Sequence, residues 1–307
     1  MLRCGGVCLR RHLGRERLYL STTILNHTAQ TTDDSTRVIP IKLTPDLTSS
    51  TQDPNTSASE ALVTGGLGFT PHDPPDQETV EQPLYETHVR TNLFQRTILT
   101  CGSAVSAILD PRRHDMVAVL GETTGHTALT RLHTLMSDDS EGRRILVDKP
   151  RINTSTIDLD ALRKLPDDSL GRTYINFLEV NDVTPDSRLP VQFVDDPELA
   201  YVMQRYREGH DLFHTVLGMP TNMLGEVAVK WVEALQTGLP MCYGAAVFGP
   251  LRFRPKQRQK YLSVYLPWAL RVGRTGRLLM NVYFEERWEQ SIHEVRAEFG
   301  IEPPPDV

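Results

Sequence analysis

The chain has 307 residues, enough for one large domain or two small ones, and its 39% hydrophobic and 23% charged residues are typical of a globular protein with a sizeable core. Its formal charge of −6 argues against a general nucleic-acid-binding protein, so no nucleic acid is expected among its partners. No stretch of the sequence is apolar for long enough to span a bilayer, so any membrane association should be peripheral.

The first 82 residues differ in composition from the rest of the chain. Five arginines opposed by one glutamate crowd residues 1–17, and serine and threonine follow them. An Arg-rich, acid-poor leader of this kind is typical of a mitochondrial transit peptide, which we expect over about residues 1–30; a disordered basic tail is the alternative. Residues 31–82 are rich in Thr, Ser, Asp, Pro and Gly, which predicts a disordered linker because such a segment buries too little apolar surface to fold.

Residues 83–307 are expected to form a single, mainly α domain, because apolar residues recur there at helical spacing. Pro197 should occupy the first position of a central helix. Cys101 and Cys242 are isolated among apolar or small residues, which is typical of reduced core thiols. The expected helical segments are 93–109, 129–136, 197–217, a segment ending at Gly238, a segment from Pro255 that may be bent at Pro267, and 288–299.

The segment HDLFHTVLGMPTNMLGE, residues 210–226, holds a pattern of metal-binding side chains. His210 and His214 lie four residues apart, so their imidazoles would share one face of a helix. On an unbroken helix Glu226 would lie about 18 Å further along the axis, too far to share an ion. Gly218-Met219-Pro220 breaks the helix, and Thr221 or Asn222 can cap a second helix that returns Glu226 to the histidines.

Two histidines at helical spacing are common by chance, and they can instead cap carbonyls or occupy a polar part of the core. Glu226 after the break favours a metal site, because mixed histidine and carboxylate ligation suits a catalytic zinc ion, our preferred candidate, or a ferrous or other divalent ion. Asp211 is a fourth candidate ligand. It can instead accept a hydrogen bond from a ligand histidine and fix its tautomer, or pair with Arg205 or Arg207.

Two other metal-dependent classes share some of these residue types. A zincin protease needs a glutamate between its histidines in the pattern HExxH, and that glutamate is missing here. A phosphohydrolase built on a His-Asp doublet needs further His and Asp ligands at distant positions. His114-Asp115 offers a second doublet, so the residues alone leave this class open.

Four longer stretches accompany the histidine pattern: LDPRRHDMVAVLGETTG from Leu109, VTPDSRLPVQFVDDPELAYVMQRYREGHD from Val183, LGMPTNMLGEVAVKWVE from Leu217 and LMNVYFEERWEQ from Leu279. With them, the region from about Tyr85 to Pro304 closely resembles the mitochondrial ubiquinone-biosynthesis proteins of the coenzyme Q four family. The hallmark of that family is HDxxH followed by eleven residues and a glutamate. This chain matches it at His210, Asp211, His214 and Glu226.

The resemblance implies a helical protein that is peripheral to the mitochondrial inner membrane, on its matrix side. The implied partners are the other enzymes of the ubiquinone biosynthetic complex, a polyprenylated benzoate substrate, inner-membrane lipid and further copies of the chain in a homo-oligomer. The implied reaction is metal-dependent C1-decarboxylation of 4-hydroxy-3-methoxy-5-polyprenylbenzoate, coupled in some members to hydroxylation at the same carbon. The alternative is a non-catalytic, lipid-binding scaffold that organises the same complex.

This chemistry fits the residues. A divalent ion held by His210, His214 and Glu226 is expected to bind the departing carboxylate or to polarise the phenol. Asp211 and Glu226 are the candidate catalytic residues, Asp211 as a proton donor or an orienting group. A basic run at residues 252–260 is expected either to meet anionic lipid headgroups or to form a solvated helix face.

Overall fold

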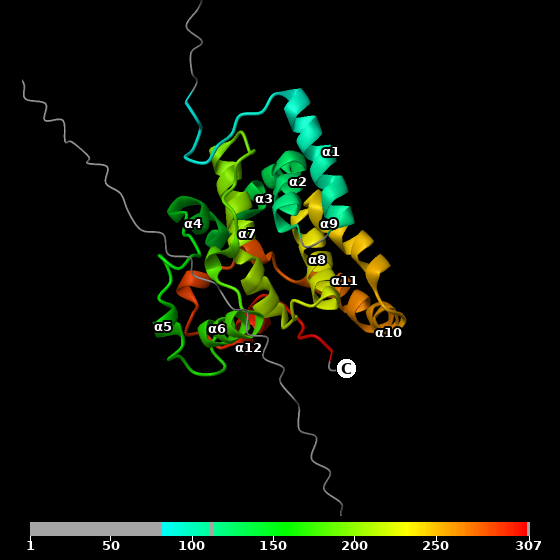
Figure 1. Ribbon diagram of the computed structural model, residues 1–307. Helices are drawn as coiled ribbons and strands as arrows, with labels where there is room; N and C mark the ends of the chain where they lie inside the picture. The colour runs from blue at the N-terminus through cyan, green and yellow to red at the C-terminus, as the bar shows by residue number, and fades with distance from the viewer. Residues whose placement is uncertain (1–81, 111–112, 306–307) are drawn as a thin grey trace, which may run out of the picture. The chain divides into compact units, whose positions relative to one another are not determined.

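The computed structural model describes residues 82–110 and 113–305, and all of them belong to one unit of the chain, Pro74–Val307. The described residues form helices and no β-strand, so the expected mainly α fold is confirmed. The helices, shown in Figure 1, are α1 (Leu93–Leu109), α2 (His114–Thr124), α3 (His126–Asp138), α4 (Ser140–Asp148), α5 (Leu159–Leu162), α6 (Leu170–Asn181), α7 (Pro197–Leu217), α8 (Met223–Thr237), α9 (Pro240–Phe248), α10 (Pro255–Lys260), α11 (Leu266–Thr275) and α12 (Ile292–Glu298).

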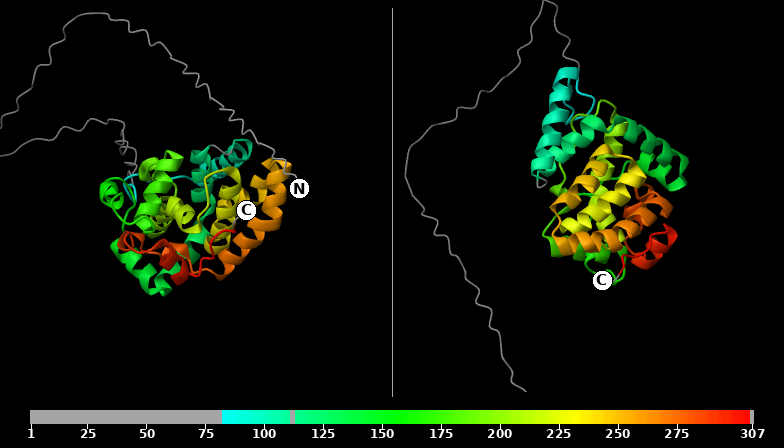
Figure 2. Two further views of the ribbon diagram at one scale, coloured as in Figure 1. Left: turned by 90° about the horizontal axis from the view of Figure 1, so that it is seen from below. Right: turned by 90° about the vertical axis from the view of Figure 1, so that its right-hand side faces the viewer.

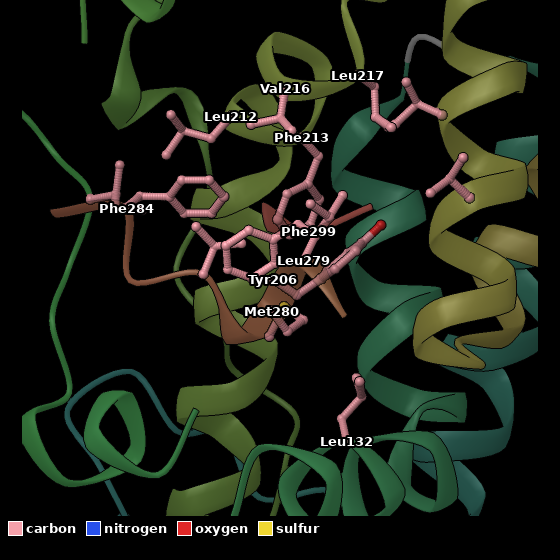
Figure 3. Packing of buried hydrophobic residues seen from close by; sticks show 14 of the residues in the cluster. Leu132, Tyr206, Leu212, Phe213, Val216, Leu217, Leu279, Met280, Phe284 and Phe299 are labelled. Carbon is pink, nitrogen blue, oxygen red and sulfur yellow. The ribbon is translucent and has the colours of Figure 1, made fainter. Parts of the chain in front are cut away.

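Helix α7 is the central element of the fold, since every residue from Leu199 to Leu217 is buried. Its apolar side chains pack against the C-terminal part of the chain. Figure 3 shows Phe213 beside Phe284, and the two ring centroids lie 6.2 Å apart. Burying the arginines of α7 would be costly without partners, and ion pairs with carboxylates offset that cost. Arg205 pairs with Glu285 in this way.

Helix α7 starts where the sequence predicts. Pro197 is its first residue, and the carboxylate of Asp196 accepts hydrogen bonds from the backbone N–H groups of Glu198 and Leu199. The proline needs no hydrogen-bond partner in the first turn, and the aspartate satisfies two donors that otherwise have none. The start of the helix that carries His210 and His214 is therefore fixed by local sequence.

Other predicted segments are also helical, but their bounds or helix type differ from the prediction. The 129–136 stripe lies in α3, which buries Leu129, Leu132 and Met136. The segment from Pro255 consists of α10 and α11 joined by a π-helical turn, Tyr261–Tyr265, directly before Pro267. In the last predicted segment only Ile292–Glu298 is helical. No helix of the described chain is both long enough and apolar enough to cross a bilayer.

Helix α1 has the predicted bounds, but its apolar residues do not form core. Phe94 is 73% exposed and Leu109 is 77% exposed, while Ser103 is the buried residue of this helix. Cys101 is also exposed, so its assignment as a core thiol was wrong; Cys242 is buried as expected. Helical spacing identifies an apolar face but does not tell whether that face points inward.

The predicted transit peptide at 1–30 and nearly all of the predicted linker at 31–82 lie outside the described residues. The helical domain predicted from residue 83 begins close to the first described residue, and helices α1 to α12 all lie within it.

Candidate metal centre

The turn between α7 and α8 brings the two parts of the metal-binding pattern together. Gly218 ends α7 in a left-handed conformation, with φ of 66°, which a glycine adopts at no steric cost. The N–H of Met219 then donates to the carbonyl of His214. Asn222 begins α8, and its side-chain oxygen accepts from the N–H groups of Leu224 and Gly225. The break and the cap are the ones that the sequence predicts, with Asn222 as the capping residue.

Gly225 makes the tight return possible. A Cβ atom at this position would lie 2.0 Å from the carbonyl oxygen of Pro220, which no side chain can tolerate. The first turn of α8 therefore packs directly on the backbone of the connecting turn. This close contact places Glu226, the next residue, opposite α7.

His210, His214 and Glu226 converge on one point between α7 and α8. One potential ligand atom from each lies within 4.8 Å of the other two. His214 Nε2 is 3.4 Å from Glu226 Oε1, and His210 Nε2 is 3.7 Å from Glu226 Oε2. Both histidines are buried, whereas the Glu226 side chain is 34% exposed, so the cluster opens to solvent on the α8 side.

The two histidines are oriented by different acceptors. Nδ1 of His210 lies 2.5 Å from Oε1 of Glu233, and Nδ1 of His214 lies 3.0 Å from the carbonyl oxygen of Met219. A carboxylate and a carbonyl can only accept, so each Nδ1 carries the proton. In the neutral form of each ring, Nε2 on the side of Glu226 then has a free lone pair, which is the tautomer that a metal ligand needs.

Glu226 is held as an anion. Burial alone would raise its pKa, but His210 and His214 in their protonated, positively charged forms hold the pKa of this carboxyl well below its usual range. Burial and the Lys230 ammonium lower the pKa of His210, but the carboxylates of Glu233 and Glu226 outweigh them and raise it above its ordinary value. The cluster is thus an anionic carboxylate facing two imidazoles.

A buried polar network supports His210 from α8 and α9. Glu233 accepts hydrogen bonds from Lys230 Nζ at 2.6 Å and from the hydroxyl of Tyr206 at 2.7 Å. Although burial would raise it, the pKa of Glu233 is lowered by Lys230 and His210. Burial and the neighbouring Glu233 carboxylate raise the pKa of the Cys242 thiol to about 12, which keeps it protonated.

Lys230 and Glu233 were not predicted as site residues, although the sequence holds a signal for them. Both follow Glu226 on α8, at four and seven residues, so the three side chains share one face of that helix. Charged residues repeating along the buried face of a helix are rare unless they are paired. That pattern marks the supporting network.

Asp211 lies outside the three-residue cluster. Its buried carboxylate forms an ion pair with Arg188, which lies between α6 and α7, rather than with Arg205 or Arg207. Burial lowers the pKa of Arg188, but Asp211 and, more weakly, Glu226 raise it above its ordinary value. Asp211 and Arg188 therefore form a charged pair beside the histidines.

The second His-Asp doublet does not take part. His114 and Asp115 begin α2, and the Asp115 carboxylate pairs with Arg113. Among the described residues, the group that can hold a metal ion is His210, His214 and Glu226. The distant ligands that a His-Asp phosphohydrolase needs are therefore not supplied by this doublet.

The cluster fits a divalent metal ion. Nε2 of His214 is fully buried and makes no hydrogen bond, although a polar atom without a partner is costly in the interior. Two ligand atoms at about 2.1 Å from one ion lie roughly 3–4 Å apart, close to the separations seen here. An ion at this point would satisfy the His214 lone pair and leave an open coordination position towards the exposed side of Glu226.

Comparison with known proteins identifies the family. Residues 85–305, nearly all of the described chain, match the family described as "Coenzyme Q (ubiquinone) biosynthesis protein Coq4". This chain is a member of the Coq4 family.

Two curated relatives share most of their length with this chain, and both are named "Ubiquinone biosynthesis protein COQ4 homolog, mitochondrial". The protein of Aedes aegypti is 59% identical over 236 residues, which is 75% of this chain and 86% of the relative. That of Drosophila pseudoobscura pseudoobscura is 58% identical over 244 residues, 78% of this chain and 91% of the relative. The resemblance inferred from the sequence is therefore confirmed.

A crystal structure of a Nostoc punctiforme protein assigned to ubiquinone biosynthesis has a similar fold. It aligns with a TM-score of 0.55 at 20% identity and covers 69% of this chain and all of the other chain. At this identity the likeness extends to the fold alone.

Proposed function

We propose that this protein is a metal-dependent carbon–carbon lyase of ubiquinone biosynthesis, which removes the C1 carboxylate of 4-hydroxy-3-methoxy-5-polyprenylbenzoate. The observation that carries the proposal is the buried, unpartnered Nε2 of His214, which faces Glu226 within a preorganised His-His-Glu cluster. Membership of a family named for ubiquinone biosynthesis supplies the pathway, and the cluster supplies the chemistry.

His210, His214 and Glu226 would hold the ion, and zinc is our preferred candidate. A divalent ion bound there supplies Lewis acidity towards the carboxylate or phenol oxygen of the substrate. Glu233 and the Met219 carbonyl hold the imidazoles in the ligand tautomer, so the ligands need little reorganisation. Burial of both histidines excludes bulk water from that side of the cluster.

The Arg188–Asp211 pair supplies the remaining charged groups near the cluster. Decarboxylation leaves electron density at C1 of the ring, which a proton must neutralise. Asp211 is our candidate for delivering or orienting that proton, because it follows His210 directly and is buried. Arg188 would hold Asp211 in place and provide positive charge where a carboxylate substrate binds.

The test uses the purified chain loaded with one defined divalent ion and a 4-hydroxy-3-methoxybenzoate with a short prenyl tail. Loss of the mass of CO2 by the wild type but not by His214→Ala is the expected result. Product formation under anaerobic conditions separates simple decarboxylation from the oxidative variant, in which an oxygen atom is added at C1. A folded, metal-loaded protein that gives no turnover with zinc, iron or another divalent ion would contradict the proposal.

A second candidate is a non-catalytic, lipid-binding scaffold of the ubiquinone biosynthetic complex, which the exposed apolar face of α1 favours because such a face needs a partner. In a scaffold, Glu226→Ala should impair folding or partner binding together with pathway output. In an enzyme, the same variant should stay folded and assembled but inactive. We further propose that the protein acts on the matrix side of the mitochondrial inner membrane as a peripheral homo-oligomer.

A further inference from the structure

Helix α1 carries an apolar stripe on the face that points away from the protein. The stripe is formed by exposed residues at intervals of three, four or seven: Phe94, Ile98, Cys101, Val105 and Ile108. The opposite face, which packs on α2, is polar, and Arg96 donates there to the backbone carbonyls of Glu122 and Thr123. An amphipathic helix normally buries its apolar stripe, so this reversed orientation marks a surface that something else covers.

The apolar surface continues onto α9 and the turn after it. Val247, Phe248 and Leu251 are 52%, 46% and 72% exposed. The guanidinium of Arg252 donates to the carbonyl of Ile108, which joins this turn to the end of α1. Figure 1 shows α1, α9 and α10 along the same side of the fold, and the right-hand view of Figure 2 faces that side. These elements therefore present one surface.

The part of this surface formed by α9 and residues 252–260 is basic and holds no acidic residue. Residues 234–284 contain no Asp or Glu and eight Lys or Arg, in a chain whose net charge is −6. Five of these cations lie at 252–260, and α1 has no acidic residue either. Arg254, Lys256 and Arg258 are exposed, and no ion pair within the described chain engages them. Cations beside an apolar stripe are the pattern that an anionic lipid surface attracts.

We propose that the α1 stripe and the basic segment 252–260 form one docking surface for an anionic lipid bilayer. A second copy of the chain is a poorer fit, because a two-fold contact through this surface would bring identical cations face to face. The inference rests on the proposed function to the extent that a polyprenyl-tailed substrate resides in a bilayer.

The docking surface is anchored to the helix that carries Glu226. Phe253, between two exposed arginines, is buried with Val227 and Tyr261. Trp231 of α8 donates its indole N–H to the Tyr261 hydroxyl at 2.7 Å. Val227 directly follows Glu226 on α8, so the helix that carries Glu226 also packs against the docking surface.

The experiment measures binding of the full chain to vesicles of phosphatidylcholine mixed with phosphatidylglycerol, and to phosphatidylcholine alone. One variant combines Arg254→Gln, Lys256→Gln and Arg258→Gln; another combines Phe94→Ser, Ile98→Ser and Val105→Ser. A charge-matched control combines Arg143→Gln, Arg163→Gln and Lys164→Gln, which are exposed near α4 and α5 on the other side of the fold. All proteins keep residues 1–81, so any contribution of that segment is common to them.

The wild type and the control should bind the mixed vesicles alike. The basic-segment variant should lose about 100-fold in affinity, at about fivefold per cation. The α1 variant should lose about tenfold or more, because exposed apolar area no longer enters the bilayer. Both variants should retain stoichiometric metal and turnover of a short-tailed, soluble substrate.

Three outcomes would overturn the docking surface. These are no binding by the wild type, an equal loss in the charge-matched control, or unchanged vesicle binding by the α1 variant with a change in its oligomeric state. The last outcome would assign the stripe to a second copy. None of these readouts requires turnover of the polyprenylated substrate, so failure of the proposed reaction would be seen separately, as a metal-loaded protein that binds vesicles but yields no product.

Discussion

At the scale of single residues, the two histidines of the candidate metal centre are oriented by different kinds of acceptor. A backbone carbonyl, which substitution cannot remove, orients His214, whereas the carboxylate of Glu233 orients His210. Glu233 also balances the buried ammonium of Lys230. The His210 half of the site therefore depends on one replaceable side chain.

Glu233→Gln should lower metal affinity by about 10–100-fold, because the amide oxygen accepts more weakly than a carboxylate and no longer makes the imidazole more basic. Competition with a metal chelator gives the affinity, and circular dichroism checks the fold. Glu294→Gln, at an exposed position in the first turn of α12, is the control and should leave affinity unchanged. Wild-type affinity in the Glu233 variant would show that the imidazole is held by packing alone.

Asp211→Asn distinguishes a ligand from a neighbour of the ligands. Because Asp211 pairs with Arg188 and lies outside the cluster, this variant and the wild type should each bind one equivalent of metal, while His214→Ala should bind none. Loss of the charged pair should cost about 2 kcal/mol of stability. Metal content by mass spectrometry of the native protein, together with urea unfolding, tests both statements. Loss of the metal from a folded Asp211 variant would make Asp211 a ligand.

At the scale of elements, the connection between α7 and α8 decides whether the site exists. Its dimensions depend on Gly225, where a Cβ atom would lie 2.0 Å from the Pro220 oxygen. Gly225→Ala should therefore force the turn apart, move Glu226 from the histidines and destabilise the protein by several kcal/mol, on the order of 3. Thermal unfolding and metal content measure the two effects.

Gly102→Ala is the matched control for that substitution. Gly102 also lies inside a helix, α1, but nothing lies within 4 Å of the position where its Cβ atom would be. Alanine should stabilise the protein there by about 0.5–1 kcal/mol, since it restricts the unfolded chain. If the two variants had the same unfolding temperature and the same metal content, the close approach of Gly225 to Pro220 would not be required for the site.

The elements that are encoded locally could be predicted from the sequence. Pro197, the Gly218 break and the cap of α8 are short-range signals, and they suffice to predict the two-helix arrangement of the site. The orientation of α1 could not be predicted, because its periodicity is the same whether the stripe faces core or lipid. The partner of Asp211 could not be predicted either, since Arg188 lies 23 residues away and only tertiary packing unites them.

At the scale of the whole molecule, the interior of the described chain and one of its outer sides differ in character. The interior is built around α7, whose charged side chains are paired. The outer side of α1 and α9 is apolar and is flanked by the exposed cations Arg254, Lys256 and Arg258. Helix α8 lies between them, with Glu226 facing α7 and Val227 packed beneath the basic segment. A change at the candidate metal centre should therefore change the free energy of unfolding of the whole unit.

Metal removal tests this link between the centre and the fold. Without an ion, His214 keeps a buried Nε2 with no partner, so the folded state gains from binding while the unfolded chain cannot assemble the three ligands. At a free metal concentration of about 100 times Kd, the bound ion should stabilise the fold by about 2.7 kcal/mol. For a unit of this size the unfolding temperature should rise by roughly 5–10 °C, and a chelator should reverse the change.

The His214→Ala variant should remain folded but should no longer be stabilised by added metal, because the substitution removes both the ligand and the unpartnered Nε2 atom. Phe177, whose ring centroid lies 5.7 Å from that of His214, would border the space left behind, so a modest loss of basal stability is expected in the variant. Calorimetry of both proteins with and without metal separates the two contributions. If metal raised the unfolding temperature of His214→Ala as much as that of the wild type, the ion would be bound elsewhere, and the centre between α7 and α8 would lose its central support.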